Sequence, residues 1–304
     1  MSEVPAPTPA PAQSPAASLA TPAPGPSSRS SAAGVAAMLG SGLSTQIGAA
    51  TGSLAFPVIG PIGVVAVRQY VAALVLLAVD RPRLRSFTWQ QWWPVLLLAV
   101  VYGAMNLSLY TAVDRVGLGL AVTLEFLGPL ALALSAARRV DAACAVLAAA
   151  GVVTLMRPQP STDYLGMGIG AFGGACWAAY ILLNRTVGHR IPGAQGSAAA
   201  ACLSALVFLP VGVLVALNRP PTAIALGCAV ITGLLSTAVP YLVDLFTLRR
   251  VPPAAFGLFM SVNPVLAALV GWIGLDQRLG LLDAAAVGAV VTANALSILT
   301  AARR

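Results

Sequence analysis

The stretch AVTLEFLGPLALAL, Ala121 to Leu134, is apolar over its whole length except for one carboxylate, Glu125. Similar apolar runs recur along the chain after residue 31, separated by short polar breaks. Of the 304 residues, 58% are hydrophobic and 9% are charged, whereas an average soluble domain has about 25% charged residues. A soluble fold could not hide so much apolar surface in one core. The sequence therefore predicts an all-α integral membrane protein.

The length of the apolar runs predicts the number of membrane-spanning helices. A bilayer core of about 30 Å needs about 20 helical residues. This length divides the chain into ten expected spans, at residues 32–55, 62–79, 93–113, 117–137, 141–157, 164–184, 197–217, 222–248, 252–274 and 281–301.

All seventeen basic residues are arginines, and the net charge is +8. Twelve arginines fall on one side of the expected spans and four on the other, with Arg68 inside a span. The positive-inside rule then predicts that both termini are cytoplasmic, in a multi-pass protein of the inner (cell) membrane. The arginines form no basic run with interleaved aromatics, which argues against nucleic-acid binding.

The sequence also indicates an N-terminal tail and an internal duplication. Residues 1–30 are rich in Pro, Ala and Ser, and are expected to form a disordered cytoplasmic tail. DRVGLGLAVTLEFLGPLALAL (114–134) aligns with RRVPPAAFGLFMSVNPVLAAL (249–269). The remaining chain is therefore expected to form two five-helix repeats, residues 31–157 and 158–304. Because five is odd, the second repeat would be inverted, as in many secondary transporters.

Glu125 and Arg68 are the main candidate site residues. Glu125 lies eight residues into its expected span, about 12 Å deep at roughly 1.5 Å per residue. An ionisable group within the membrane is a functional-site hypothesis by default. Arg68 is expected within one helical turn of the same depth. A permanent ion pair would make Glu125 structural, whereas an opening pair would let Glu125 exchange a proton or hold an ammonium.

Two prolines are expected to break helices at the site. Pro129 has no N–H to donate to the carbonyl of Glu125, so that carbonyl would be a free acceptor beside the carboxylate. Pro264 occupies the matching position in the second repeat. Asp244, near the cytoplasmic end of its span, is expected either to pair with a neighbouring arginine or to relay protons.

Polar and aromatic residues at helical spacing are expected to line a cavity or a contact between helices, since hydrocarbon satisfies no hydrogen bond. The candidate substrate-binding residues of this kind are Gln46, Tyr102, Asn106, Trp177, Tyr180 and Tyr241. Gly166, Gly170 and Gly174 form a stripe that predicts a close contact with another helix.

Enzymatic chemistry finds no support in the motifs. There is no HExxH, no P-loop and no GxSxG, and the four cysteines lie in apolar segments without metal-ligand spacing near His189. No catalytic residue, metal or cofactor is therefore expected, and the chain is predicted not to be an enzyme.

The sequence resembles the drug/metabolite transporter superfamily, within it the EamA family, and especially the threonine/homoserine exporter subgroup. The segments that carry the resemblance, within residues 35–300, are STQIGAATGSLAF, YGAMNLSLYTAVDRVGLGLAVTLEFLGPLALAL, GACWAAYILLNR and LSTAVPYLVDLFTLRRVPPAAFGLFMSVNPVLAAL. The chain departs from the family where Val262-Asn263 precede Pro264, in place of a frequent Glu-Pro. It departs again at Leu275-Asp276, in place of Gly-Glu.

The resemblance implies a transporter that exports small amino acids such as threonine and homoserine in exchange for protons. Arg68 and Glu125 would offer one donor and one acceptor cluster to a zwitterion. A drug or other metabolite transporter of the same fold, or a non-transporting membrane scaffold, remain the alternatives, and homodimer formation is left open.

Overall fold

The computed structural model describes residues 28–135, 139–275 and 280–302, and this part of the chain contains helices and no strand. Residues 1–27 of the expected tail and Asp276 lie outside the described residues. The elements are α1 (Ser28–Ser53), α2 (Phe56–Val79), η1 (Leu84–Ser86), α3 (Trp89–Val116), α4 (Leu118–Ser135), α5 (Arg139–Met156), α6 (Tyr164–Arg190), α7 (Gln195–Asn218), α8 (Ala223–Gly233), η2 (Leu234–Ala238), α9 (Val239–Leu248), α10 (Pro253–Phe259), α11 (Val262–Leu275) and α12 (Leu281–Ala302).

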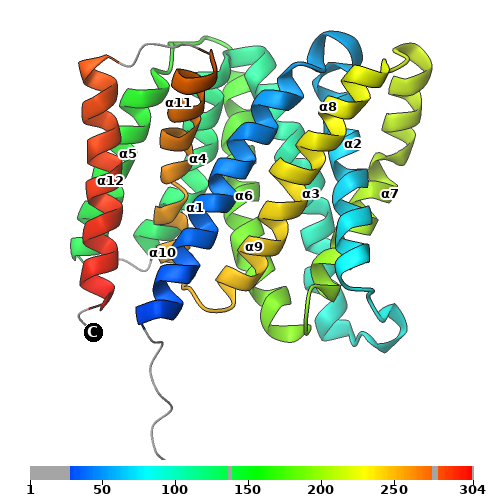
Figure 1. Ribbon diagram of the computed structural model, residues 1–304, viewed down its shortest axis with the longest axis horizontal. Helices are drawn as coiled ribbons and strands as arrows, with labels where there is room; N and C mark the ends of the chain where they lie inside the picture. The colour runs from blue at the N-terminus through cyan, green and yellow to red at the C-terminus, as the bar shows by residue number, and fades with distance from the viewer. Residues whose placement is uncertain (1–27, 136–138, 276–279, 303–304) are drawn as a thin grey trace, which may run out of the picture.

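The helices stand side by side and run up and down the molecule, and α1 begins at the same edge at which α12 ends (Figure 1). Within the described residues, six segments are long and apolar enough to cross a membrane: residues 56–79, 89–116, 164–190, 195–218, 223–248 and 253–270. Large apolar side chains such as Leu206, Leu217 and Ile224 are exposed on the outside. Such a surface suits lipid and not water. The predicted class, an all-helical integral membrane protein, is thus confirmed.

Helices α2 and α3 begin earlier than the apolar pattern predicts, each for a local reason. Helix α3 starts at Trp89 instead of residue 93, because Thr88 and Gln91 form a capping box. Helix α2 starts at Phe56 instead of residue 62 but contains a kink at Gly60, which has a φ of 70°. Only glycine adopts this conformation readily. Hydrophobicity alone carries neither signal.

Helix α6 lies at the centre of the packing. It contacts α3 and α4 over long stretches, while α2 packs on α7 and α5 packs on α12. The expected close contact of the glycine stripe is confirmed. A Cβ on Gly174 would lie 2.8 Å from the carbonyl oxygen of Leu124 in α4, and one on Gly170 would lie 3.1 Å from the Leu124 side chain. Larger residues there would push the two helices apart.

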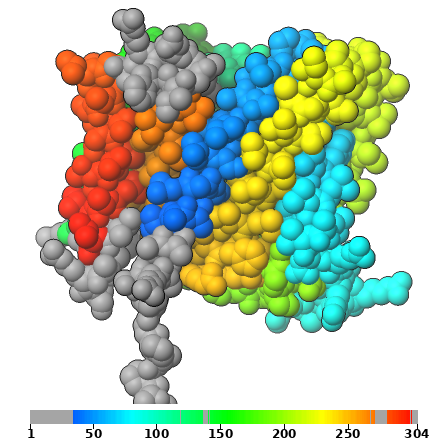
Figure 2. All heavy atoms as spheres, viewed as in Figure 1, coloured from blue at the N-terminus to red at the C-terminus, as the bar shows by residue number. Residues whose placement is uncertain are grey.

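Helix α1 crosses the face shown in Figure 2, where it lies along α8, η2 and α9. Gly48 of α1 allows the close approach, since a Cβ there would lie 2.9 Å from the backbone nitrogen of Ser236. The hydroxyl of Thr232 donates to the Gly48 carbonyl over 2.9 Å. Helix α1 is thereby fixed to the end of α8 and to the segment η2 that follows it.

The two prolines expected to break helices behave differently. The expectation is wrong for Pro129, because α4 is continuous from Leu118 to Ser135 around it. A membrane helix tolerates one lost hydrogen bond where neighbouring helices pack closely. Near Pro264 the helix does stop, at Met260 and Ser261 between α10 and α11. Pro264 has no N–H to donate to the Met260 carbonyl four residues earlier. That carbonyl accepts the Asn263 N–H instead, over 3.0 Å.

Candidate functional site

Three tyrosines from three helices meet in the interior, and we call them the tyrosine cluster: Tyr102 (α3), Tyr180 (α6) and Tyr241 (α9). The rings of Tyr102 and Tyr241 are stacked, with centroids 3.9 Å apart and planes 12° apart. The Tyr180 ring lies 5.8 Å from Tyr102 and 5.9 Å from Tyr241. All three are buried.

Polar side chains surround the tyrosine cluster. The Tyr180 hydroxyl donates to Oδ2 of Asp244 over 2.7 Å. Asn106 donates to the Tyr102 carbonyl over 2.8 Å and to the Tyr241 hydroxyl over 3.4 Å. Asp244 is only 9% exposed. Its hydrogen-bond partner is Tyr180, and within the described chain it forms no ion pair with a neighbouring arginine.

The amides of Gln69 and Asn184 extend this network. Nε2 of Gln69 in α2 donates to the Tyr102 carbonyl over 3.1 Å. In α6, Nδ2 of Asn184 donates to the Tyr180 hydroxyl over 3.5 Å, and Oδ1 of Asn184 accepts from the Ser197 hydroxyl over 3.2 Å. The network thus joins α2, α3, α6, α7 and α9 in the centre of the molecule.

Arg68 forms a second polar centre, with the segment η2. Its Nε donates to Oγ1 of Thr237 over 2.9 Å, and its Nη2 donates to the carbonyl of Ser236 over 3.1 Å. Its Nη1 donates to the Tyr110 hydroxyl over 2.8 Å. Pro240 explains the carbonyl contact, because it lacks the N–H that would bond to Ser236, four residues earlier. The guanidinium satisfies the acceptor that proline and the π-helical turn leave open.

The polar stretch of α1 supports the same turn. The Ser44 hydroxyl donates to the Leu235 carbonyl over 2.8 Å, and the Ser236 hydroxyl donates to the Thr45 carbonyl over 2.6 Å. Gln46, a predicted substrate contact, is next to these residues and partly exposed. Trp177, another predicted contact, packs partly buried against the apolar core. Neither joins the tyrosine cluster through a hydrogen bond or ring contact among the described residues.

Glu125 lies where α4 packs on the glycines of α6. It is 7% exposed, and its Oε1 lies 3.9 Å from the position of a Cβ on Gly173. In the part of the chain that the structure describes, its carboxylate has neither a hydrogen bond nor an ion pair, so the expected pairing with Arg68 is not formed. The carbonyl of Glu125, freed by Pro129, faces the backbone of Gly174.

Two grooves open between the helices outside these centres. One, of about 430 Å³, lies between α3 and α6 and includes Ser108, Tyr164 and Phe172. The other, of about 470 Å³, lies between α2, α3 and α7 and includes Gly103, Ser204 and Phe208. Both are lined mainly by apolar side chains, and neither is lined by Arg68, Glu125 or the tyrosine cluster.

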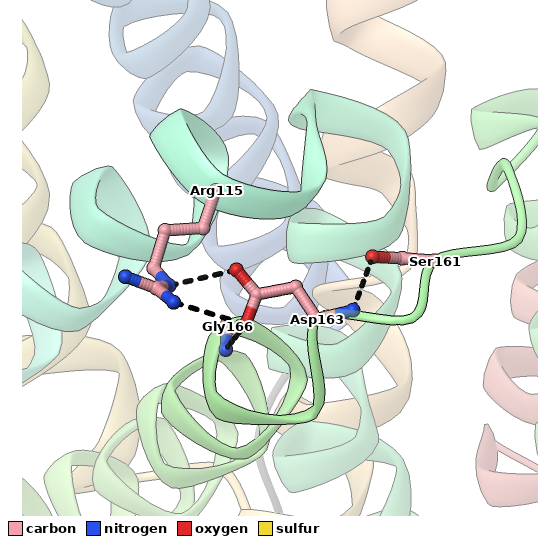
Figure 3. Close-up of polar contacts among 4 residues, drawn as sticks. All are labelled: Arg115, Ser161, Asp163 and Gly166. Carbon is pink, nitrogen blue, oxygen red and sulfur yellow. Dashed lines mark hydrogen bonds and ion pairs between the residues drawn. The ribbon is translucent and has the colours of Figure 1, made fainter.

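An ion pair joins α3 to the start of α6 at one end of the bundle (Figure 3). Nε of Arg115 lies 2.9 Å from Oδ2 of Asp163, and Oδ1 of the same carboxylate caps α6 by accepting the Gly166 N–H over 2.9 Å. The backbone N–H of Asp163 donates to the Ser161 hydroxyl over 3.1 Å. The bonds from Arg115 and Gly166 hold the pKa of Asp163 below its usual range.

Gln69, Ser236 and Thr237 were not among the residues expected from the sequence. Gln69 is a lone amide beside Arg68 in an apolar run, and Pro240 stands four residues after Ser236. Both features can be read from the sequence and could have indicated these residues. The sequence does not show toward which partner each side chain points.

Buried acids, a buried guanidinium and amides at the contacts of apolar helices define a multi-pass membrane protein with a polar interior. A family model described as the EamA-like transporter family matches residues 164–299. The chain is 38% identical over 263 residues to the threonine/homoserine exporter RhtA of Escherichia coli (strain K12), covering 84% of this chain and 88% of the relative. It is 36% identical over 266 residues to RhtA of Salmonella typhimurium (strain LT2), covering 86% and 89%.

The chain belongs to the EamA-like transporter family. A solved crystal structure shares its fold, with a TM-score of 0.71 and 20% sequence identity, covering 90% of this chain and 98% of the other.

Proposed function

We propose that this protein is a secondary active transporter that exports small amino acids of the threonine and homoserine type from the cytoplasm in exchange for protons. The substrate class rests on the names of relatives that align over more than four-fifths of the chain. The antiport mechanism rests on one observation: Glu125 is buried in an apolar helix and forms no hydrogen bond or ion pair among the described residues. A membrane acid in this state is suited to bind an exchangeable cation.

The architecture we propose is ten membrane helices in two inverted repeats, residues 31–157 and 158–304, after a tail of residues 1–30. Helices at matching positions of such repeats would be α2 and α7, α4 and α10, and α5 and α12, and each of these pairs is in contact. The contact of α3 with α6 has its counterpart in the contact of α1 with α8 and α9. The common edge of the first and last helices supports placing both termini on the same side of the cell membrane (Figure 1), and the bias of the arginines supports the cytoplasmic side.

A zwitterionic substrate would use both polar centres. In our proposal Arg68 binds its carboxylate, and Glu125 takes either its ammonium or a proton. The tyrosine cluster, with Asn106, Gln46 and Trp177, forms the walls of the path. Competition for Glu125 would let only the loaded or the protonated carrier change sides. Asp244, bonded to Tyr180, would pass protons on the cytoplasmic side.

Efflux from vesicles tests this function. Purified protein is reconstituted into vesicles loaded with labelled threonine, and the medium is made acidic. Efflux should accelerate with the pH gradient and slow when a protonophore dissipates it. Threonine efflux that ignores the gradient would contradict antiport. Absence of amino-acid efflux, with transport of cationic dyes instead, would favour the drug-transporter alternative, and a lack of both would favour a scaffold.

A further inference from the structure

Three arginines lie in the short connection between α2 and α3: Arg81, Arg83 and Arg85. All three are exposed, and within the described part of the chain none of their guanidinium groups forms a hydrogen bond or an ion pair. An extended chain advances at most about 3.5 Å per residue, so their Cα atoms lie within about 14 Å of one another. The connection protrudes at the lower right edge of the bundle, in cyan (Figure 2).

Other arginines at this end of the molecule hold the fold together. The guanidinium of Arg249 donates to three backbone carbonyls in and beside the connection between α6 and α7. Arg190 donates to the Gln90 carbonyl over 2.6 Å, and its guanidinium lies 5.0 Å from the centroid of the Trp93 ring. Contacts within the protein therefore account for these two arginines. They do not account for the three in the connection between α2 and α3.

The backbone that carries the three arginines is held by hydrogen bonds. The carboxylate of Asp80 accepts the Ala194 N–H over 2.8 Å, and Oε1 of Gln195 accepts the Arg83 N–H over 3.3 Å. The Ser86 hydroxyl donates to the Arg83 carbonyl over 2.8 Å. A ligand of the guanidinium groups would thus bind to a backbone that is already ordered, which lowers the entropic cost of binding.

Exposed apolar side chains lie beside the arginines. Leu84, between Arg83 and Arg85, is 45% exposed, and Trp89 at the start of α3 is 73% exposed. Tryptophan is enriched where a membrane meets water. Helices α2 and α3 are both long and apolar enough to cross a membrane, so the connection between them lies at the level of the lipid head groups. The anion available at that level is the lipid phosphate.

We propose that Arg81, Arg83 and Arg85 form a binding site for the head group of an anionic phospholipid. A guanidinium binds phosphate oxygens through two parallel N–H···O bonds. A zwitterionic head group offers the same phosphate but adds a cation of its own, which the cluster of arginines disfavours. Leu84 and Trp89 contact the first carbons of the acyl chains. The site is independent of the transported substrate, and its occupation stabilises the contact with the connection between α6 and α7.

Lipid retention in native mass spectrometry tests the site. Purified full-length protein in detergent is offered equal amounts of phosphatidylglycerol and phosphatidylcholine. The wild-type protein should retain phosphatidylglycerol in preference by about tenfold or more, since each arginine near anionic lipid changes the affinity by roughly fivefold. The double variant Arg83→Gln/Arg85→Gln should bring the ratio close to one. Its melting temperature without added lipid should not change, because no side-chain contact of these arginines is lost.

Arg219→Gln is the matched control. Arg219 follows the other end of α7, and it is exposed, with no hydrogen bond or ion pair of its side chain among the described residues. The single variant Arg85→Gln removes the same charge from the proposed site and should lower the preference by roughly fivefold. Arg219→Gln should leave the preference intact. An equal loss in both variants would contradict a site in the connection between α2 and α3.

Melting temperatures give a second measurement. Phosphatidylglycerol should raise that of the wild-type protein more than phosphatidylcholine does, and this difference should disappear in the double variant. Equal retention of the two lipids by the wild-type protein, or a preference that survives the double substitution, overturns the site and leaves these arginines as determinants of membrane orientation alone. Stabilisation by inorganic phosphate to the same extent as by phosphatidylglycerol would overturn the lipid as the ligand.

Discussion

The buried carboxylates of Asp244 and Glu125 are placed in apolar surroundings by different means. Asp244 in α9 accepts a hydrogen bond from Tyr180 over 2.7 Å. Glu125 in α4 has no such partner in the described chain and owes its place to the contact of α4 with the glycines of α6. The comparison indicates that a hydrogen bond fixes the position of Asp244, whereas only the packing of α4 against α6 fixes the position of Glu125. An acid held by shape keeps its oxygens available to a guest.

The largest effect is expected where the shape is changed. A Cβ on Gly128 would collide with the carbonyl oxygen of Gly174 in α6. Gly128→Ala should force α4 and α6 apart, at a cost of about 1–3 kcal/mol or more, and reduce the yield of folded protein. Size-exclusion chromatography in detergent would measure this. Gly168→Ala is the control, because a Cβ there meets nothing within 4 Å. Equal yields for the two variants would contradict a shape-held Glu125.

The next effect concerns the proposed exchange at Glu125. Glu125→Gln keeps the size of the side chain but cannot bind a proton or an ammonium by charge. It should lower gradient-driven threonine efflux by about tenfold or more, which corresponds to ~1.4 kcal/mol. Efflux from vesicles with and without a pH gradient is the measurement. Gradient-dependent efflux at the wild-type rate would remove Glu125 from the coupling mechanism.

A smaller effect is expected at the acid that already has a partner. Asp244→Asn can still accept the Tyr180 hydroxyl through its amide oxygen, so the fold should survive with little change in melting temperature. Efflux should fall by only about two- to fivefold, which is below ~1 kcal/mol. If Asp244→Asn stops transport completely while Glu125→Gln does not, the roles of the two acids are reversed.

The smallest effect is expected far from both acids, at the exposed pair of Arg115 and Asp163. The pKa of Asp163 is lowered in the folded protein, first by Arg115. Its contribution to stability is therefore present at neutral pH and is lost as the pH falls below the ordinary aspartate value of about 4. Arg115→Gln should lower the melting temperature slightly at pH 7, with the difference from wild type shrinking toward acid pH. A difference that grows toward acid pH would contradict this assignment.

Much of the fold follows from features that a sequence displays directly. The apolar runs predict the membrane helices, and the stripe of Gly166, Gly170 and Gly174 predicts a close contact with another helix, which Gly170 and Gly174 make with α4. Both depend on periodicity along one helix. The helix starts at Phe56 and Trp89 depend on a kink and a capping box, which hydrophobicity does not report.

The site was predictable only in part. The helical spacing of Tyr102 and Asn106 predicted an interior contact, and the structure joins them to Tyr241. The similar depth of Arg68 and Glu125 makes an ion pair between them plausible from the sequence, but the structure does not form it. Depth along two helices does not fix their rotation, and Arg68 instead faces the carbonyl that Pro240 leaves free.

The π-helical turn of residues 234–238 determines which side chains of α9 face α6. Such a turn accommodates one residue more than an α-helix does, and one residue corresponds to a rotation of about 100°. Helix α9 is therefore turned relative to α8 by that angle. Removal of a single residue from the turn would present another side of α9 to α6, and Asp244 would lose Tyr180 without any change in either residue.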